Sequence, residues 1–399
     1  MAIPLFVLLL FAVVSLAVCL VSAAQIGICR LHKKLQNTAA VRLKKSTLLL
    51  AGVAVSTALL TTVSQFTART PEITDQQGRV LNGSIAELEK VELNGREEWI
   101  SIRGKNRKNP VLLFLAGGPG GTQMAAVRSE LAGLEDRFVV VNWDQPGSGK
   151  SYHAVANDKI TVDTYLKDGL ALTDYLRKRF STEKIYLIGE SWGSALGVFL
   201  VDAAPEKYSA LIGTGQMVDF QETETADYKK GMELAKANHD EKTVKKLISN
   251  GPPPYYGQDV TWKSAVYLNC ISDEMAENPN ITDGGYHTIR DMFASEYGIM
   301  DSVNYLRGIV NTFNHVYPQL YGVDLRKDYI KLKVPIYFFI GRHDINAPVS
   351  LTQEYYHLLN APRKEIVWFE HSGHDPWMNE SKLFVSQTIR VFLEQPVQP

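Results

Sequence analysis

The chain has 399 residues, of which 45% are hydrophobic and 21% are charged, and its formal net charge is −1. These proportions are typical of a globular protein, and the near-zero charge excludes an electrostatic basis for nucleic-acid binding. The charges are unevenly distributed, however, because no acidic residue precedes Glu72.

The N-terminal segment contains two apolar stretches separated by basic residues. Neither Ala2–Cys29 nor Ser46–Phe66 contains a charged residue, and each is long enough to cross a membrane, which takes about 20 residues. The segment between them holds Arg30, Lys33, Lys34, Arg42, Lys44 and Lys45. We therefore predict that residues 1–71 form a membrane anchor of two transmembrane helices with a basic loop at 30–45.

The position of the lysines and arginines also predicts the orientation of this anchor. Short loops rich in these residues stay on the cytoplasmic side, so the chain after about Arg69 is expected on the non-cytoplasmic side. A cleaved signal peptide is one alternative for the first stretch, but the basic n-region of such peptides is missing. A lipoprotein signal ending at Cys19 is another, but Val18 is bulkier than the residue that usually precedes a lipidated cysteine.

Strand and helix patterns alternate through most of the remaining chain. Val91–Gly104 alternates around Asn94-Gly95, a dipeptide typical of tight β-hairpins. The segments that follow are a strand at Val111–Leu115, a helix at Met124–Leu134, a strand at Phe138–Asn142, a helix at Val162–Phe180 and a strand at Lys184–Ile188. After a long gap come a strand at Val334–Ile340, a helix at Leu351–Leu359, a strand at Glu365–Phe369 and a helix at Lys382–Glu394. This order predicts a mostly parallel sheet covered by helices on both faces.

The segment between these two parts has a different character. It is charged, helix-like and rich in tyrosine, and it contains Gly251–Pro254, a Gly-Pro-Pro-Pro run that no helix interior tolerates. We interpret residues 216–328 as a helical cap inserted into a core domain, whose first part is 72–215 and whose second part is 329–399.

A candidate nucleophile follows the strand at Lys184–Ile188. Residues 189–193 read Gly-Glu-Ser-Trp-Gly, and a helix-like stretch continues from Ser194. The order strand, Gly-x-Ser-x-Gly, helix is that of the nucleophile elbow of α/β-hydrolases, where small residues on either side of the serine permit a sharp turn. The pattern therefore predicts an α/β-hydrolase fold with Ser191 as its nucleophile.

An acid and a base are expected after the nucleophile, in that chain order. Asp344 follows the strand at Val334–Ile340, and His374 follows the strand at Glu365–Phe369. An imidazole must accept the serine proton, and a carboxylate must orient the imidazole. His371 is the alternative base, but Gly373 beside His374 permits a closer approach. A His-x-x-His metal pair lacks further ligands, so we expect neither a metal nor an organic cofactor.

Two glycine-rich loops are candidates for binding roles. Ala116–Gly121 follows a predicted strand, and we expect the N–H of Gly118 to form the oxyanion hole together with that of Trp192. The segment Asp144–Ser151 ends like a phosphate-binding loop, but such a loop requires glycine at position 144. We interpret this second loop as a tight turn.

Three of these motifs together resemble those of the prolyl iminopeptidases. They are Gly-Gly-Pro-Gly-Gly at 117–121, Asp-Gln-x-Gly-x-Gly-x-Ser at 144–151 and Gly-x-Ser-Trp-Gly-Ser at 189–194. Members of this family are serine aminopeptidases of the α/β-hydrolase fold that remove N-terminal proline. Ala116 stands where the family usually has histidine, and Pro146 where it usually has arginine. These departures concern proline specificity rather than hydrolysis.

The resemblance implies that carboxylates of the cap bind the free amino terminus of a short peptide. The best equivalents here are Glu222 and Glu224, although acidic residues also suit a solvated helix start. The expected function is thus an aminopeptidase with a Ser-His-Asp triad, held at a lipid bilayer by its anchor. An esterase or small-amide hydrolase using the same triad is the first alternative. A non-catalytic binding domain is the second, and the intact triad disfavours it.

Overall fold

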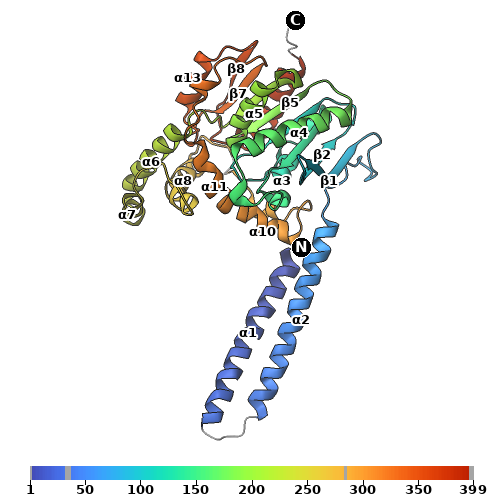
Figure 1. Ribbon diagram of the computed structural model, residues 1–399, viewed down its shortest axis with the longest axis vertical. Helices are drawn as coiled ribbons and strands as arrows, with labels where there is room; N and C mark the ends of the chain where they lie inside the picture. Colours follow the sequence, from blue (N-terminus) through green and yellow to red (C-terminus); the bar gives the residue numbers. More distant parts are fainter. Residues whose placement is uncertain (1, 32–36, 283–284, 395–399) are drawn as a thin grey trace. The chain divides into compact units, whose positions relative to one another are not determined.

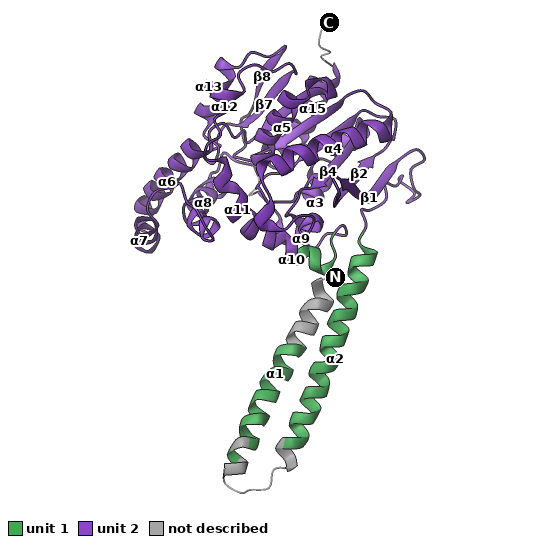
Figure 2. Cartoon of the chain, in the orientation of Figure 1, with its two compact units in different colours: residues 1–68, 297–302 green, residues 69–296, 303–399 purple. Residues whose placement is uncertain are grey.

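The computed structural model describes residues 2–31, 37–282 and 285–394, which divide into two compact units (Figures 1 and 2). The smaller unit comprises residues 1–68 together with 297–302, and the larger one comprises 69–296 together with 303–399.

Two long helices make up most of the smaller unit. They are α1 (Ala2–Leu31) and α2 (Asn37–Thr67), which run side by side (Figure 2). Among the described residues, one helix is long and apolar enough to cross a membrane, namely Ala40–Thr67, and α1 contributes the shorter apolar stretch Phe11–Ile26. Length and composition therefore support one of the two expected spans. Part of the expected basic loop, 32–36, lies outside the described residues.

An eight-stranded sheet forms the centre of the larger unit, with the strand order β1-β2-β4-β3-β5-β6-β7-β8. The strands are β1 (Ile85–Leu93), β2 (Arg96–Gly104), β3 (Val111–Leu115), β4 (Val139–Asp144), β5 (Ile185–Glu190), β6 (Tyr208–Thr214), β7 (Ile336–Gly341) and β8 (Lys364–Phe369). The β1–β2 and β2–β4 pairs are antiparallel, and all other pairs are parallel. The expectation of a mostly parallel sheet is therefore confirmed.

Both faces of the sheet are buried because its strands alternate between two hydrophobic clusters. In β3, Leu113 and Leu115 belong to one cluster, and Leu112 and Phe114 belong to the other, as the two-residue period of a strand requires. Helices α4 (Val162–Phe180), α5 (Trp192–Ala203) and α13 (Val349–Leu358) cover the first face. Helices α3 (Met124–Glu130), α14 (Pro376–Asn379) and α15 (Ser381–Ile389) cover the second.

All the regular elements that the structure describes between β6 and β7 are helices. The α-helices among them are α6 (Phe220–Ala237), α7 (Glu241–Asn250), α8 (Val260–Glu277), α9 (Thr288–Met292), α10 (Ile299–Arg307), α11 (Phe313–Val316) and α12 (Leu325–Asp328). Helices α6, α7 and α8 bury a small core of their own around Leu247, Tyr255 and Tyr267. The segment was expected to be helical, and these elements are helices. Figure 1 shows α6 and α8 at the side of the sheet.

Candidate active site

The turn between β5 and α5 places Ser191 at the end of the central strand. Ser191 has φ of 52° and ψ of −120°, a backbone conformation that is costly for a residue with a side chain. Its N–H donates to the Thr214 carbonyl at 2.9 Å, and its own carbonyl accepts from the Ser194 N–H at 2.9 Å. These bonds hold the serine in its strained conformation.

The glycines on either side of the elbow are required by close backbone approaches. A Cβ at Gly189 would collide with the carbonyl of Gly193, and a Cβ at Gly193 would collide with the carbonyl of Leu115 in β3. Glycine is therefore required on both sides of Ser191 because there is no room for a side chain, and not only because of its backbone flexibility.

His374 and Asp344 meet beyond the ends of neighbouring parallel strands, β8 and β7. His374 Nδ1 lies 3.0 Å from Asp344 Oδ2. The other carboxylate oxygen, Asp344 Oδ1, accepts the N–H groups of Asn346 and Ala347, both at 2.9 Å. The acid is thus fixed by the backbone, and it fixes the histidine ring in turn.

The electrostatic surroundings of His374 favour the imidazolium. Burial lowers the pKa of His374, but the Asp344 carboxylate, followed by Asp375 and Glu190, outweighs this effect and raises the pKa to about 10. The alternative base, His371, is exposed, and its Nδ1 lies 3.2 Å from the Asn280 carbonyl. It does not line the cavity around Ser191.

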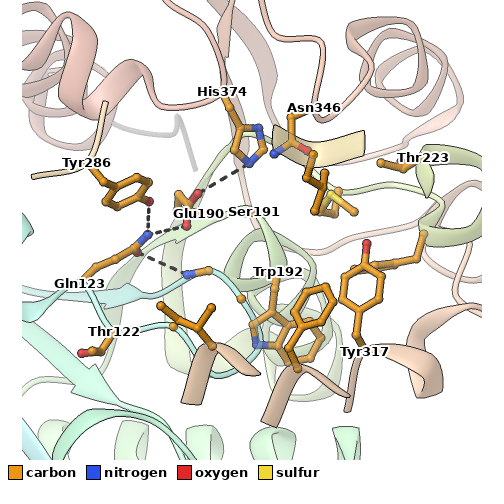
Figure 3. A pocket seen from close by; sticks show the side chains of 18 of the residues that line it. Thr122, Gln123, Glu190, Ser191, Trp192, Thr223, Tyr286, Tyr317, Asn346 and His374 are labelled. Carbon is orange, nitrogen blue, oxygen red and sulfur yellow. Dashed lines mark hydrogen bonds and ion pairs between the residues drawn. The ribbon is translucent and has the colours of Figure 1, made fainter. Parts of the chain in front are cut away.

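A cavity of about 330 Å³ brings the expected catalytic groups together (Figure 3). Ser191, Trp192 and His374 line it beside Gly118. Trp192 is the first residue of α5, so its N–H has no acceptor within the helix. Gly118 has φ of 126°, which a glycine adopts without strain. Both expected oxyanion donors therefore belong to residues at the cavity.

The two cap carboxylates singled out from the sequence occupy different environments. Glu222 is exposed on α6 and forms an ion pair with Arg326 at 2.6 Å, so it takes no part in the cavity. Glu224 lines the cavity and is buried. Its carboxylate accepts hydrogen bonds from the hydroxyls of Tyr267, of Tyr317 at 2.9 Å, and of Ser264 at 3.3 Å.

Asp227 is a third acidic residue on α6, and it was not predicted from the sequence. It lines the same cavity, its side chain is buried, and Asp227 Oδ1 has no hydrogen-bond partner among the described residues. Burial, followed by the nearby charges of Glu224 and Asp344, raises the pKa of Asp227 well above its ordinary value. Asp227 and Glu224 are three residues apart, so they lie on one face of α6. This spacing could have identified Asp227 from the sequence.

Three other polar residues at the site, Glu190, Gln123 and Asp375, were also not predicted. Glu190 and Gln123 line the cavity together with Tyr286 of the cap (Figure 3), and Asp375 follows His374 directly in the sequence. Glu190 is the variable residue of the Gly-x-Ser-x-Gly pattern, which carries no signal for its role.

Comparisons with known proteins agree with the fold described above. Residues 110–242 match the family model of the alpha/beta hydrolase fold. The probable aminopeptidase YbaC of Bacillus subtilis is 31% identical over 319 residues, which cover 77% of this chain and 96% of that protein. A proline iminopeptidase of Saccharolobus solfataricus is 26% identical over 74% of this chain and 87% of its own length. The crystal structure of a proline iminopeptidase from Mycobacterium smegmatis superimposes with a TM-score of 0.56 at 17% identity, over 77% of this chain and 98% of that one.

Proposed function

This chain belongs to the prolyl iminopeptidase-like family of the α/β-hydrolase fold, and from that premise we propose that it is a serine aminopeptidase. Its proposed substrates are short peptides whose N-terminal residue is proline or another small apolar residue.

The proposed mechanism assigns one role to each group at the elbow. Ser191 attacks the scissile carbonyl while His374 Nε2 accepts its proton, and Asp344 orients and stabilises the imidazolium. The N–H groups of Gly118 and Trp192 hold the oxyanion. His374 then protonates the leaving amine, and water releases the acyl group by the reverse sequence of proton transfers.

The observation that carries the substrate proposal is the unpartnered oxygen of Asp227 in the cavity that contains Ser191. A buried carboxylate oxygen without a donor is costly, and the ammonium of a free N-terminus supplies both the donor and the opposite charge. Glu224, whose carboxylate already accepts three hydroxyls, adds negative charge at the same place. An uncharged ester would leave Asp227 unsatisfied.

The apolar part of the cavity is suited to the side chain of the first residue. Phe220, Leu268, Ile309 and Phe313 line it, and they provide a surface against which a proline ring or a small aliphatic side chain packs without polar competition.

We also propose that the N-terminal helices anchor the protein in a membrane, with the catalytic domain on the non-cytoplasmic side. The apolar helix Ala40–Thr67 and the basic residues between the two apolar stretches support this proposal. Alkaline carbonate extraction of cell membranes tests it. The chain is expected to stay in the pellet, and its release into the supernatant would refute the anchor.

The substrate proposal is tested with the full-length chain in detergent. Hydrolysis of prolyl and alanyl anilides is compared with that of N-blocked prolyl anilide and p-nitrophenyl esters. We expect a strong preference for the unblocked anilides, because only these carry the ammonium. Ester cleavage without peptidase activity would leave the triad in place and make the protein an esterase.

A further inference from the structure

Two acidic residues besides Asp344 act on His374, the buried Glu190 and the half-buried Asp375. Glu190 ends β5 and Asp375 follows β8, so the two residues come from strands that are not neighbours in the sheet. Glu190 is 3% exposed, and the mechanism proposed above gives neither residue a role.

Glu190 contacts the histidine through one of its carboxyl oxygens. Glu190 Oε1 lies 3.7 Å from His374 Nε2, the nitrogen that must accept the serine proton. Figure 3 shows Glu190 beside His374. The ring is therefore held between two acidic residues, with Asp344 at Nδ1 and Glu190 at Nε2.

The second carboxyl oxygen of Glu190, Oε2, connects it to the loop Ala116–Gly121 that contains Gly118, called the oxyanion loop below. Gln123 Nε2 donates to Glu190 Oε2 at 2.7 Å, and Gln123 Oε1 accepts the N–H of Gly117 at 3.3 Å. Gly117 also packs so closely on the Glu190 carboxyl that a Cβ there would collide with it. One side chain thus links the base to the loop that holds Gly118.

Asp375 is hydrogen-bonded to Glu190. A carboxylate has no hydrogen to donate, so this bond exists only when one of the two carboxyls is protonated. Tyr286 donates its hydroxyl hydrogen to Asp375 Oδ1 at 3.2 Å and also contacts Gln123. Burial is the main cause that raises the pKa of both carboxyls. The charge of Asp375 adds to the rise at Glu190, and the charge of Asp344 adds to the rise at Asp375, in keeping with a retained proton.

We propose that Glu190 and Asp375 share a single proton and act together as positioning residues, presenting one negative charge to His374 and fixing the oxyanion loop through Gln123. The proposal rests on the proposed roles of Ser191 and His374, and it is independent of the proposed substrate.

The charge of the pair matters because His374 must be neutral to accept a proton. The charged or titratable groups that face the ring are Asp344, Glu190, Asp375 and, across the cavity, Asp227. A second full charge on the pair would stabilise the imidazolium further, so less His374 would be in the neutral form that accepts the serine proton. The shared proton keeps the pair at one charge, which still stabilises the imidazolium that forms in the transition state.

The test measures the pH dependence of Ser191 reactivity toward a neutral, serine-reactive fluorophosphonate. This probe carries no amine, so the result does not depend on whether the protein is an aminopeptidase. The full-length wild type is compared with Glu190→Gln, Asp375→Asn and the double variant. Glu370→Gln is the matched control, because Glu370 is exposed and pairs with Arg342.

A shared proton predicts a non-additive pattern. Each single variant still has one ionised carboxylate, so the acidic limb of the rate profile stays near its wild-type position. The double variant loses that charge, and its acidic limb moves to lower pH by roughly 1–3 units. A single variant that shifts as far as the double variant would overturn the proposal, as would a double variant with an unshifted limb.

The alkaline side of the profile provides a second measurement if the double variant does not fold. Loss of the shared proton in the wild type separates the two carboxylates and lowers the rate at high pH. Neither single variant has a proton to lose there, so this transition disappears in both. An alkaline transition that persists in both single variants would contradict the shared proton.

Discussion

Replacing Asp227 by asparagine removes the charge of the unpartnered carboxylate with almost no change in volume. If Asp227 holds the substrate ammonium, the variant loses a charge-assisted hydrogen bond, worth about 1.5–3 kcal/mol. At about 1.4 kcal/mol per tenfold change, this corresponds to a fall of roughly 10- to 150-fold in kcat/KM for prolyl anilide.

The same replacement is expected to stabilise the free protein. Burial, with the nearby Glu224 and Asp344 charges, raises the pKa of Asp227 well above its ordinary value. The folded state then binds the proton more tightly than the unfolded state, so stability falls as pH rises from the unfolded pKa of about 4 toward the raised one. Asp227→Asn removes this loss, so its Tm should exceed that of the wild type at neutral pH and equal it at acid pH.

The assay compares prolyl anilide with p-nitrophenyl acetate, which has no amine, for the wild type, Asp227→Asn and Glu222→Gln. Glu222 lies on the same helix but pairs with Arg326 outside the cavity, so its replacement controls for a general effect of charge on α6. Only Asp227→Asn should lose activity, and only toward the anilide. An equal loss toward both substrates would refute the assignment of Asp227 to the ammonium.

Three further predictions concern the elbow and its partners. Ser191→Ala should abolish turnover and phosphonate labelling with an unchanged circular dichroism spectrum, and residual labelling would point to another nucleophile. Asp344→Asn should lower kcat by roughly 10⁴-fold, because the tautomer of His374 is no longer fixed. It should also move the acidic limb to lower pH, because the Asp344 carboxylate raises the pKa of His374, and a limb that stays in place would contradict that role. Gly193→Ala should lower the free energy of unfolding by about 1–3 kcal/mol or more, because its Cβ meets the Leu115 carbonyl. Denaturant titration measures this loss, and a variant as stable as the wild type would show that the elbow can relax.

The parts of the fold that were predicted correctly are those whose signal is local. Helix α4 begins and ends where its pattern predicted, because Thr161 caps it and its apolar residues recur at helical spacing. The hairpin of β1 and β2 follows from Asn94-Gly95 in the same way. Strand β6 was not predicted, because its short apolar run follows the apolar helix α5 after one tight turn at Pro205–Lys207, and periodicity alone does not separate the two.

The residues of the candidate site also divide into those with a local sequence signal and those without one. Ser191, Asp344 and His374 were singled out because each follows a strand pattern in a known chain order. The choice between Glu222 and Glu224 required the rotation of α6, which is set by burial of Phe220 and capping by Asp219. The pairing of Glu190 with Asp375 depends on how β5 and β8 are placed across the sheet, and nothing in either local sequence predicts it.

The insertion of the cap between β6 and β7 has a consequence for the biosynthesis of the protein. Ribosomes make Ser191 and the oxyanion loop first, then helices α6–α12, and only afterwards Asp344 and His374. Under the proposed mechanism, a nascent chain that has folded as far as β6 therefore has a serine in its elbow but no base to activate it. If Ser191 depends on His374 as proposed, the growing polypeptide remains chemically inert until the second part of the sheet has been translated and docked beside the first.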